Sequence, residues 1–210
     1  ASHTGCRYRS RSRTDDNTAS LGIFIDYNIT GKGIKIAEIL KGSPLQKANS
    51  RIKAGTIIEK IDGEDIGENV NYWPMLNRKA GQYMLLSLYD PASGERWDET
   101  IKPITGRQEM QLRYKNWVER CRALTEKYSG GKIGYVHVTS MNNESFKTVY
   151  EEALGLNYGK EALIVDTRFN GGGWLHDDLA TFLSGEVYLS VQPRGQKLGT
   201  EPMFKWTKPS

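Results

Sequence analysis

Residues 165–174 read VDTRFNGGGW and join two different patterns. The run ALIVDTR, residues 162–168, begins with continuous apolar residues, which predicts a parallel strand buried on both faces. Residues 174–184, WLHDDLATFLS, have the spacing of a helix. A strand that leads into a helix is typical of an α/β layer, and sites in such layers gather at the carboxyl ends of the strands.

Three successive glycines, Gly171, Gly172 and Gly173, can serve in three ways. They can cradle a phosphate group, present backbone N–H groups to a developing oxyanion, or make a tight turn. Neither GxGxxG nor GK followed by Ser or Thr occurs here, so the phosphate interpretation lacks support. The oxyanion hole and the plain turn both stay open on spacing alone.

The preceding residues extend the α/β pattern. Residues 132–138 predict a strand, and Asn142 or Asn143 can cap the helix that follows it. That helix has apolar residues at helical spacing, namely Phe146, Val149, Tyr150, Ala153 and Leu154. Two strands make a poor independent sheet. We therefore expect residues 130–210 to be the first part of a larger domain, truncated in this chain.

A long amphipathic helix is predicted upstream, over residues 109–128. Its apolar stripe consists of Trp117, Cys121, Leu124 and Tyr128. Cys121 is expected to be a small core residue of this stripe. The two cysteines of the chain, Cys6 and Cys121, have no metal-binding spacing and are too few for a disulfide framework.

The segment from residue 20 to about residue 104 is rich in predicted strands. Asp62 and Gly63 form a hairpin signal between two apolar runs, and residues 82–103 predict a second hairpin. Residues 41–48 and 71–81 each suggest a short helix. The fold class predicted for the whole chain is therefore α+β.

Composition excludes several classes of protein. The chain has 210 residues, 38% of them hydrophobic and 26% charged, with a net charge of +4, as in ordinary globular proteins. No apolar run is long enough to span a membrane, and the first residues have no signal-peptide pattern. Alternate arginines in residues 7–13 suggest a solvated strand or loop more than a nucleic-acid arm. His137 is expected to be a packed histidine of a sheet face. The HDD sequence at His176 lacks converging metal ligands.

Taken in order, several motifs resemble the tricorn-like and tail-specific serine proteases. LGIFI at residues 21–25, with GSPL and AGTIIEKIDG further on, resembles a PDZ domain. KIGYVHV, followed by ALIVDTRFNGGG, resembles the start of the catalytic domain in these proteases. SHTG at residues 2–5 resembles the Ser-His motif that precedes their PDZ domain.

This resemblance implies a domain order. Residues 1–19 would be the end of a domain that carries the catalytic base, and residues 20–105 a PDZ-like β-sandwich with two short helices. Residues 106–129 would be a linking helix. Residues 130–210 would be the N-terminal part of a crotonase-like α/β catalytic domain.

The resemblance also implies roles for particular residues. His3 would be the general base and Ser2 a member of the same tetrad. Gly171, Gly172 or Gly173 would supply one oxyanion amide, with the last two favoured. In the PDZ-like part, the loop that captures a peptide carboxylate corresponds to Ser20, Leu21, Gly22 and Ile23.

The family's nucleophilic serine and acidic tetrad member follow well after the glycine turn, and no residue up to Ser210 matches them. Ser184 and Ser190 fall in a predicted helix and a strand-like run. The expectation is a fragment, inactive by itself, of a serine endopeptidase or carboxypeptidase-like processing protease. The parent protein would act on peptides or unfolded proteins, and its PDZ domain would bind or gate the substrate. The parent protein would be a homo-oligomer without a cofactor, a metal, a nucleic-acid partner or a membrane span, and its compartment stays open between cytoplasm and periplasm. The alternative is a peptide-binding PDZ adaptor without catalysis.

Overall fold

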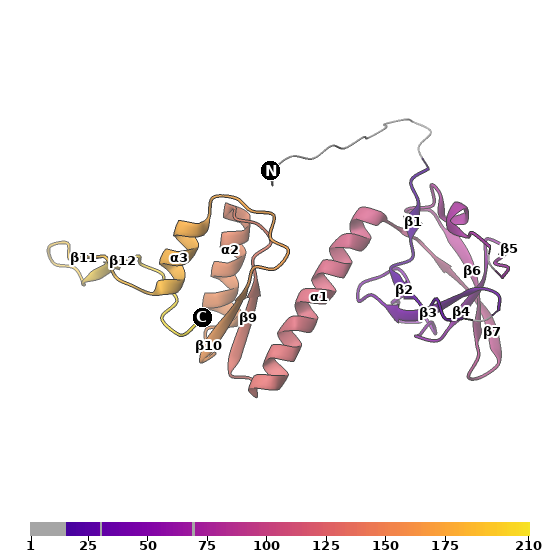
Figure 1. Cartoon of the computed structure of the whole chain (residues 1–210), viewed down its shortest axis with the longest axis horizontal. Coiled ribbons are helices and arrows are strands. Elements are labelled where there is room, and N and C mark those ends of the chain that lie inside the picture. Colours follow the sequence, from indigo (N-terminus) through magenta and orange to yellow (C-terminus); the bar gives the residue numbers. More distant parts are fainter. Residues whose placement is uncertain (1–15, 30, 69) are drawn as a thin grey trace. The chain divides into compact units, whose positions relative to one another are not determined.

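The computed structural model describes residues 16–29, 31–68 and 70–210, and the chain divides into two compact units, residues 1–116 and 117–210 (Figure 1). The division falls inside the longest helix, α1 (Gly106–Ser129), whose two halves belong to different units. The finer domain boundaries expected from the sequence remain predictions. In the described residues no helix has the length and apolar character that a membrane crossing needs.

The first unit is built on a six-stranded antiparallel sheet. Its strands are β2 (Ile23–Ile25), β3 (Ile34–Ile39), β4 (Ile57–Ile61), β5 (Glu64–Asp65), β6 (Met84–Asp90) and β7 (Glu95–Ile101). The order is β2-β3-β4-β6-β7, with β5 paired to β4, so β2 is an edge strand. A small second sheet pairs β1 (Ala19–Ser20) with β8 (Ile104–Thr105), and a 3₁₀ helix, η1, spans Trp73–Leu76.

Both predicted hairpins are confirmed. Asp62, with a φ of 50°, and Gly63, with a φ of 85°, turn β4 into β5, as an Asp-Gly hairpin requires. Strands β6 and β7 pair over seven residues each. The core of this unit contains fully buried side chains from four strands, including Ile36, Ile58 and Leu86.

Of the two short helices expected in this unit, the one in residues 71–81 is found as a 3₁₀ helix, and the one in residues 41–48 is absent. Residues 71–81 form only the four-residue 3₁₀ helix η1. Residues 41–48 form turns, in which Ser43 N donates to Leu40 O and Gln46 N donates to Ser43 O. These turns bury one anchor, Leu45, and a stretch this short gains too few intrahelical bonds to form a helix.

The second unit has a parallel two-stranded sheet, with two helices on one face and the second half of α1 on the other. Strand β9 (Ile133–His137) pairs with β10 (Ala162–Asp166) in parallel register. Its remaining elements are α2 (Asn143–Glu151), a π turn η2 (Glu152–Leu156), α3 (His176–Ser184), β11 (Leu189–Val191) and β12 (Gly199–Glu201). Figure 1 shows α2 and α3 side by side along the sheet, and their apolar side chains share one core with Val136, Val138 and Leu163.

Side chains alternate across this sheet. Val136 and Leu163 face the helices, whereas Tyr135, His137 and Asp166 lie on the opposite face, toward the second half of α1. The helix predictions are confirmed, with Asn142 as the cap of α2, where its Oδ1 accepts from Ser145 N. The prediction that β10 is buried on both faces is wrong, because Ile164 is 44% exposed.

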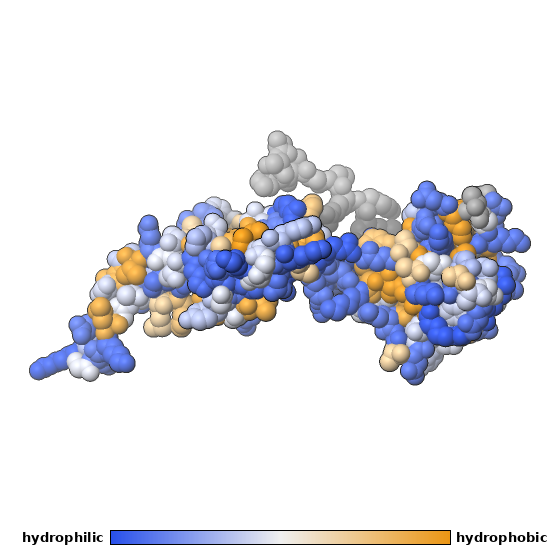
Figure 2. Space-filling model, turned by 90° about the horizontal axis from the view of Figure 1, so that it is seen from below, coloured by the Kyte–Doolittle hydropathy of each residue, from blue (hydrophilic) through white to orange (hydrophobic). Residues whose placement is uncertain are grey.

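The apolar stripe predicted for α1 is only partly covered. Cys121 is half-buried rather than a core residue, and Tyr128 is 81% exposed in the described structure. Apolar residues also lie on the surface of the β11–β12 hairpin, whose tip is hydrophilic (Figure 2). In α1 itself, none of the described residues is fully buried.

Candidate active site

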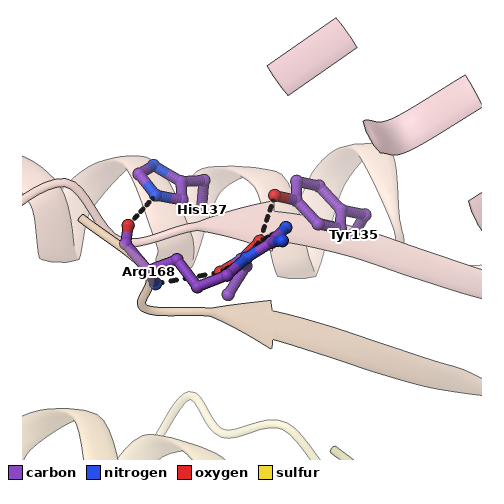
Figure 3. Close-up of polar contacts among 4 residues, drawn as sticks. Tyr135, His137 and Arg168 are labelled. Atoms are coloured by element: carbon purple, nitrogen blue, oxygen red, sulfur yellow. Dashed lines mark hydrogen bonds and ion pairs between the residues drawn. The ribbon is translucent and has the colours of Figure 1, made fainter. Parts of the chain in front are cut away.

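A polar cluster lies where β9 and β10 end (Figure 3). The parallel register pairs His137 with Asp166, so the side chains of Tyr135, His137 and Asp166 gather on one face. Tyr135 Oη donates to Asp166 Oδ2 at 2.7 Å, and His137 Nε2 donates to the carbonyl oxygen of Arg168 at 2.7 Å. Arg168 forms an ion pair with Asp166 at 2.5 Å. His137 is 5% exposed, which confirms the prediction of a packed sheet histidine.

The charges of this cluster stabilise one another. Bonds from Arg168 hold the pKa of Asp166 well below its usual range, and the Tyr135 hydroxyl acts in the same direction. Burial, together with the bond to Asp166, raises the pKa of Tyr135, which therefore remains a neutral donor. The pKa of Arg168 is raised by its bonds to Asp166. The cluster is a fixed structural support, because each charge is held in its ionised form by a partner.

The next four residues form a tight turn. Asn170 N donates to Thr167 O at 3.2 Å, and Phe169 has a φ of 61°. A positive φ at the third position is typical of a type II turn, where Gly or Asn is usual. Type I and type II turns differ in the orientation of the central peptide, whose carbonyl here belongs to Arg168. The bond from His137 to this carbonyl therefore holds the type II orientation.

Asn170 connects the turn to the glycine run. Its Nδ2 donates to Val138 O at 2.8 Å, and its Oδ1 accepts from Gly172 N at 2.7 Å. Gly171 N donates to Thr139 O at 3.3 Å. The side chain of Asn170 thus ties the start of the glycine run to the residue that follows β9.

The three glycine amides differ in what they bond. Gly171 N and Gly172 N each have a protein acceptor, but Gly173 N has none among the described residues. Gly173 is exposed and has a φ of 136°. A Cβ at this position would lie 2.1 Å from Met141 O, so only glycine fits. Gly173 N–H is therefore a donor that remains available to a ligand.

The other predicted site residues are distributed as follows. Ser2 and His3 lie outside the described residues, so their roles stay predictions. His176 begins α3, and within the described chain no three His, Cys, Asp or Glu side chains are grouped so as to hold a metal ion. Ser184 Oγ donates to Thr181 O at the end of α3, and Ser190 lies in β11.

In the first unit, β2 has an open edge beside a pocket of about 210 Å³. Leu40 N donates to Gly22 O, which makes Ile23 and Ile39 a non-hydrogen-bonded pair, so Ile23 N–H points away from β3. Ser20, Leu21 and Ile23 line the pocket, as do Trp73 and Leu76 of η1 and Glu109 and Arg113 of α1. Gly22 N is bonded within the predicted loop, to Ser20 Oγ at 2.9 Å.

One pocket-lining hydroxyl is unusual. The Oη of Tyr72 is buried and has no hydrogen-bond partner among the described residues. Burial raises the pKa of Tyr72 to about 12, so the hydroxyl is neutral. Arg113 closes one side of the pocket, with its guanidinium carbon 4.5 Å from the ring centre of Phe24 and its Nε bonded to Glu109.

Comparisons with known proteins find similarity to one group of peptidases. Residues 132–201 match the model of peptidase family S41. A tricorn protease homolog of Saccharolobus solfataricus is 30% identical over 167 residues, which are 76% of this chain and 15% of that protein. The tricorn protease of Thermoplasma acidophilum is 35% identical over 122 residues, 58% of this chain and 11% of that protein. A crystal structure of the tricorn protease has a TM-score of 0.66 at 27% identity, over 89% of this chain and 18% of that chain.

The chain is a relative of the tricorn proteases. The expected resemblance to the tricorn proteases is confirmed, whereas the PDZ assignment and the role of the SHTG motif stay predictions. The chain spans between 11% and 18% of the length of these tricorn relatives. Residues 132–201, which match peptidase family S41, include the polar cluster, the type II turn and the glycine run.

Sequence reasoning found the glycine run but missed its supports. Tyr135, Asp166, Arg168 and Asn170 were not among the predicted site residues, although their bonds hold the turn. Two signals in the sequence indicate this cluster. Tyr135 and His137 alternate along one strand, and the residues change from apolar to charged at Asp166.

Proposed function

We propose that the chain is part of a serine peptidase acting on peptides or unfolded proteins, in which Gly173 N–H is one donor of the oxyanion hole. The observation that carries this proposal is the Gly173 amide, which has no acceptor among the described residues and lies just past the carboxyl end of β10. The match of residues 132–201 to peptidase family S41 supports it.

In the proposed reaction, a serine Oγ attacks the scissile carbonyl while His3 takes the serine proton. The C–O bond forms as the carbonyl π pair moves to oxygen, and Gly173 N–H stabilises the resulting negative charge. His3 then protonates the leaving amine as the C–N bond breaks. Ser2 would orient His3, a role that the SHTG motif supports by resemblance alone.

The nucleophile and the acidic tetrad member have no assigned residue in this chain. Ser184 is bonded at the end of α3 and Ser190 lies in a hairpin strand, so neither adjoins the glycine run in sequence. We expect the 210-residue chain to be inactive by itself. Measurable turnover of an unstructured peptide by the purified chain would contradict this expectation.

The test uses a fluorophosphonate probe on the full-length protein, with the adduct mapped by mass spectrometry. One serine should be labelled, and His3→Ala should abolish labelling. Gly173→Ala should slow labelling by about 10²-fold or more, because its Cβ would lie 2.1 Å from Met141 O and would displace the donating amide from the oxyanion. Gly159→Ala is the matched control, because a Cβ there meets nothing within 4 Å. Absence of any labelled serine in the wild-type protein would refute the peptidase proposal.

A second function, peptide capture by the first unit, is favoured by the open edge of β2. An extended peptide would add to β2 through Ile23 N–H, as in strand addition to PDZ domains, with one side chain in the adjoining pocket. Ser20, Leu21, Gly22 and Ile23 would form the loop near its carboxylate. In a peptidase, this unit would deliver substrate to the active site. In an adaptor, peptide capture by this unit would be the protein's entire function.

Calorimetric titration of the chain with paired peptides tests this second function. A peptide with a free C-terminal carboxylate should bind more tightly than its amidated form. Trp73→Ala, in the pocket lining, should weaken binding by about tenfold. Tyr83→Ala, which removes an exposed aromatic side chain outside the lining, should not. Equal affinity for both peptides would exclude carboxylate capture, and binding of neither would exclude the function.

The expected homo-oligomer of the parent protein is likewise a proposal, supported by the resemblance alone. Sedimentation of the full-length protein tests it, and a monomer at all concentrations would contradict it.

A further inference from the structure

Phe169 occupies a backbone conformation that suits it poorly. Its φ of 61° lies in the left-handed region, at the third position of the 167–170 turn. Gly and Asn adopt this conformation at low cost, whereas a bulky aromatic residue is strained there. The strain is imposed by the surroundings, because His137 holds the Arg168 carbonyl and thereby the orientation of the Arg168–Phe169 peptide.

Burial of the ring does not offset this strain. The side chain of Phe169 is 86% exposed. Within the described residues its ring contact is with Trp117, at 5.7 Å between centroids and an interplanar angle of 70°. An edge contact of this kind orients the ring but leaves most of its apolar surface in solvent. Strained residues that persist without a packing reason are concentrated at functional sites.

The ring is presented by a rigid base. Trp117, which contacts Phe169, also packs edge-on against the buried His137 at 4.8 Å and lies under the Arg168 guanidinium at 5.4 Å. Asp166 holds that guanidinium in turn. The position of the Phe169 ring is therefore fixed by the same cluster that supports the glycine run.

Phe169 also lies close to the available amide. It stands four positions before Gly173 in the sequence, so their Cα atoms are at most about 14 Å apart, the length of about four residues of an extended peptide. Trp174, on the other side of Gly173 in the sequence, is 89% exposed. A peptide whose carbonyl bonded Gly173 N–H would run between or across two exposed aromatic side chains.

We propose that Phe169 is a specificity residue, whose ring contacts an apolar side chain of a peptide substrate close to the scissile carbonyl. This inference rests on the proposed peptidase function. It names the substrate class as peptides with a Leu-like or Phe-like residue near the cleaved bond, and it assigns His137 as a positioning residue that acts through the turn.

The test is an NMR titration of the ¹⁵N-labelled chain with six-residue peptides that differ at a single position, which holds Leu, Phe, Ser, Lys or Asp. The Gly173 amide and the Trp117 indole resonances are followed. The Leu and Phe peptides should shift both resonances and bind most tightly. Phe169→Asn keeps the left-handed conformation and removes the ring, so it should weaken these two peptides by about tenfold while the Ser peptide changes by less than about twofold.

Two further variants separate the ring from general effects. Phe169→Leu retains an apolar side chain and should restore most of the affinity for the Leu peptide. Tyr128→Ala removes an exposed aromatic side chain from α1 outside the turn and should leave all affinities unchanged.

The outcomes distinguish this inference from the function on which it rests. If every peptide shifts the Gly173 amide with the same affinity in wild type and Phe169→Asn, the specificity role is wrong and the oxyanion proposal stands. If no peptide shifts the Gly173 amide, both are wrong. Tight binding of the Lys or Asp peptides in preference to Leu and Phe also overturns the specificity role.

Discussion

At the scale of single residues, the bond from His137 to the Arg168 carbonyl controls the turn before the glycines. It selects one of two orientations of the Arg168–Phe169 peptide, and that orientation forces a positive φ at Phe169. A hydrogen bond of this kind contributes on the order of 1 kcal/mol, similar in size to the strain that it maintains. The two conformations of the turn are therefore close in free energy once the histidine is removed.

His137→Leu should let this peptide rotate to the type I orientation. The NOE between Arg168 Hα and Phe169 HN, strong in a type II turn, should weaken, and the NOE between the two amide protons should strengthen. Stability should fall by about 1–2 kcal/mol, because the Arg168 carbonyl loses its donor. His176→Leu, on an exposed histidine, is the control. An unchanged NOE pattern in His137→Leu would show that other contacts hold the turn.

Asp166 gives the second unit an acid-sensitive element. Its pKa is lowered in the folded chain from an ordinary value of 3.8, chiefly by Arg168, so the carboxylate favours the folded state. This stability is fully present above about pH 5 and is lost as the pH falls through the lowered folded pKa, because the unfolded chain takes up the proton first.

Asp166→Asn should therefore lower stability by about 2 kcal/mol near neutral pH and flatten its decline between about pH 5 and pH 2. Urea unfolding at a series of pH values measures both effects. Asp177→Asn, on a side chain that is 93% exposed, should retain the wild-type decline. The same acid slope in Asp166→Asn and wild type would show that the ion pair does not couple to folding.

At the scale of elements, the N-cap of α2 is Asn142 and not its neighbour Asn143. Asn142 has extended backbone angles, and its side chain accepts from Ser145 N, whereas Asn143 is the first residue inside the helix. Asn142→Ala should cost about 1 kcal/mol, and Asn143→Ala should have little effect. Chemical denaturation of the two variants measures the difference. Equal losses would mean that the cap is not formed in solution.

Elements fixed by local signals were predicted well, and those that depend on distant pairing were not. The Asp62-Gly63 turn and the helix α1 are determined by neighbouring residues, so both were predicted from the sequence. The polar cluster was not predicted, because it depends on the register that places His137 opposite Asp166, across 29 residues of chain. The glycine run was recognised as a site, but its free amide follows from a bridge to Met141.

The short helix expected over residues 41–48 failed for a related reason. Its composition fits a helix start. In the folded chain, however, the segment forms turns that pack the side chain of Leu45 into the core. Tertiary packing overrides weak local propensity in such short segments.

At the scale of the whole molecule, the two units have separate hydrophobic cores. No residue is shared between the core around Leu86 and the core around Leu163, and each of these leucines is at most 2% exposed. Because each unit buries its own apolar side chains, each has its own source of folding free energy. The chain should therefore unfold in two steps.

Calorimetry should resolve two transitions, and matched substitutions should assign them. Leu86→Ala should lower one melting temperature by about 10–20 °C and Leu163→Ala the other, because each change leaves a cavity worth about 3 kcal/mol. A single transition lowered by both changes would show that the units fold as one. Separate transitions would also allow each of the two proposed functions to be assigned to one unit. Peptides that need the pocket beside β2 should still bind Leu163→Ala above the melting temperature of its second unit, whereas shifts of the Gly173 amide should be lost there.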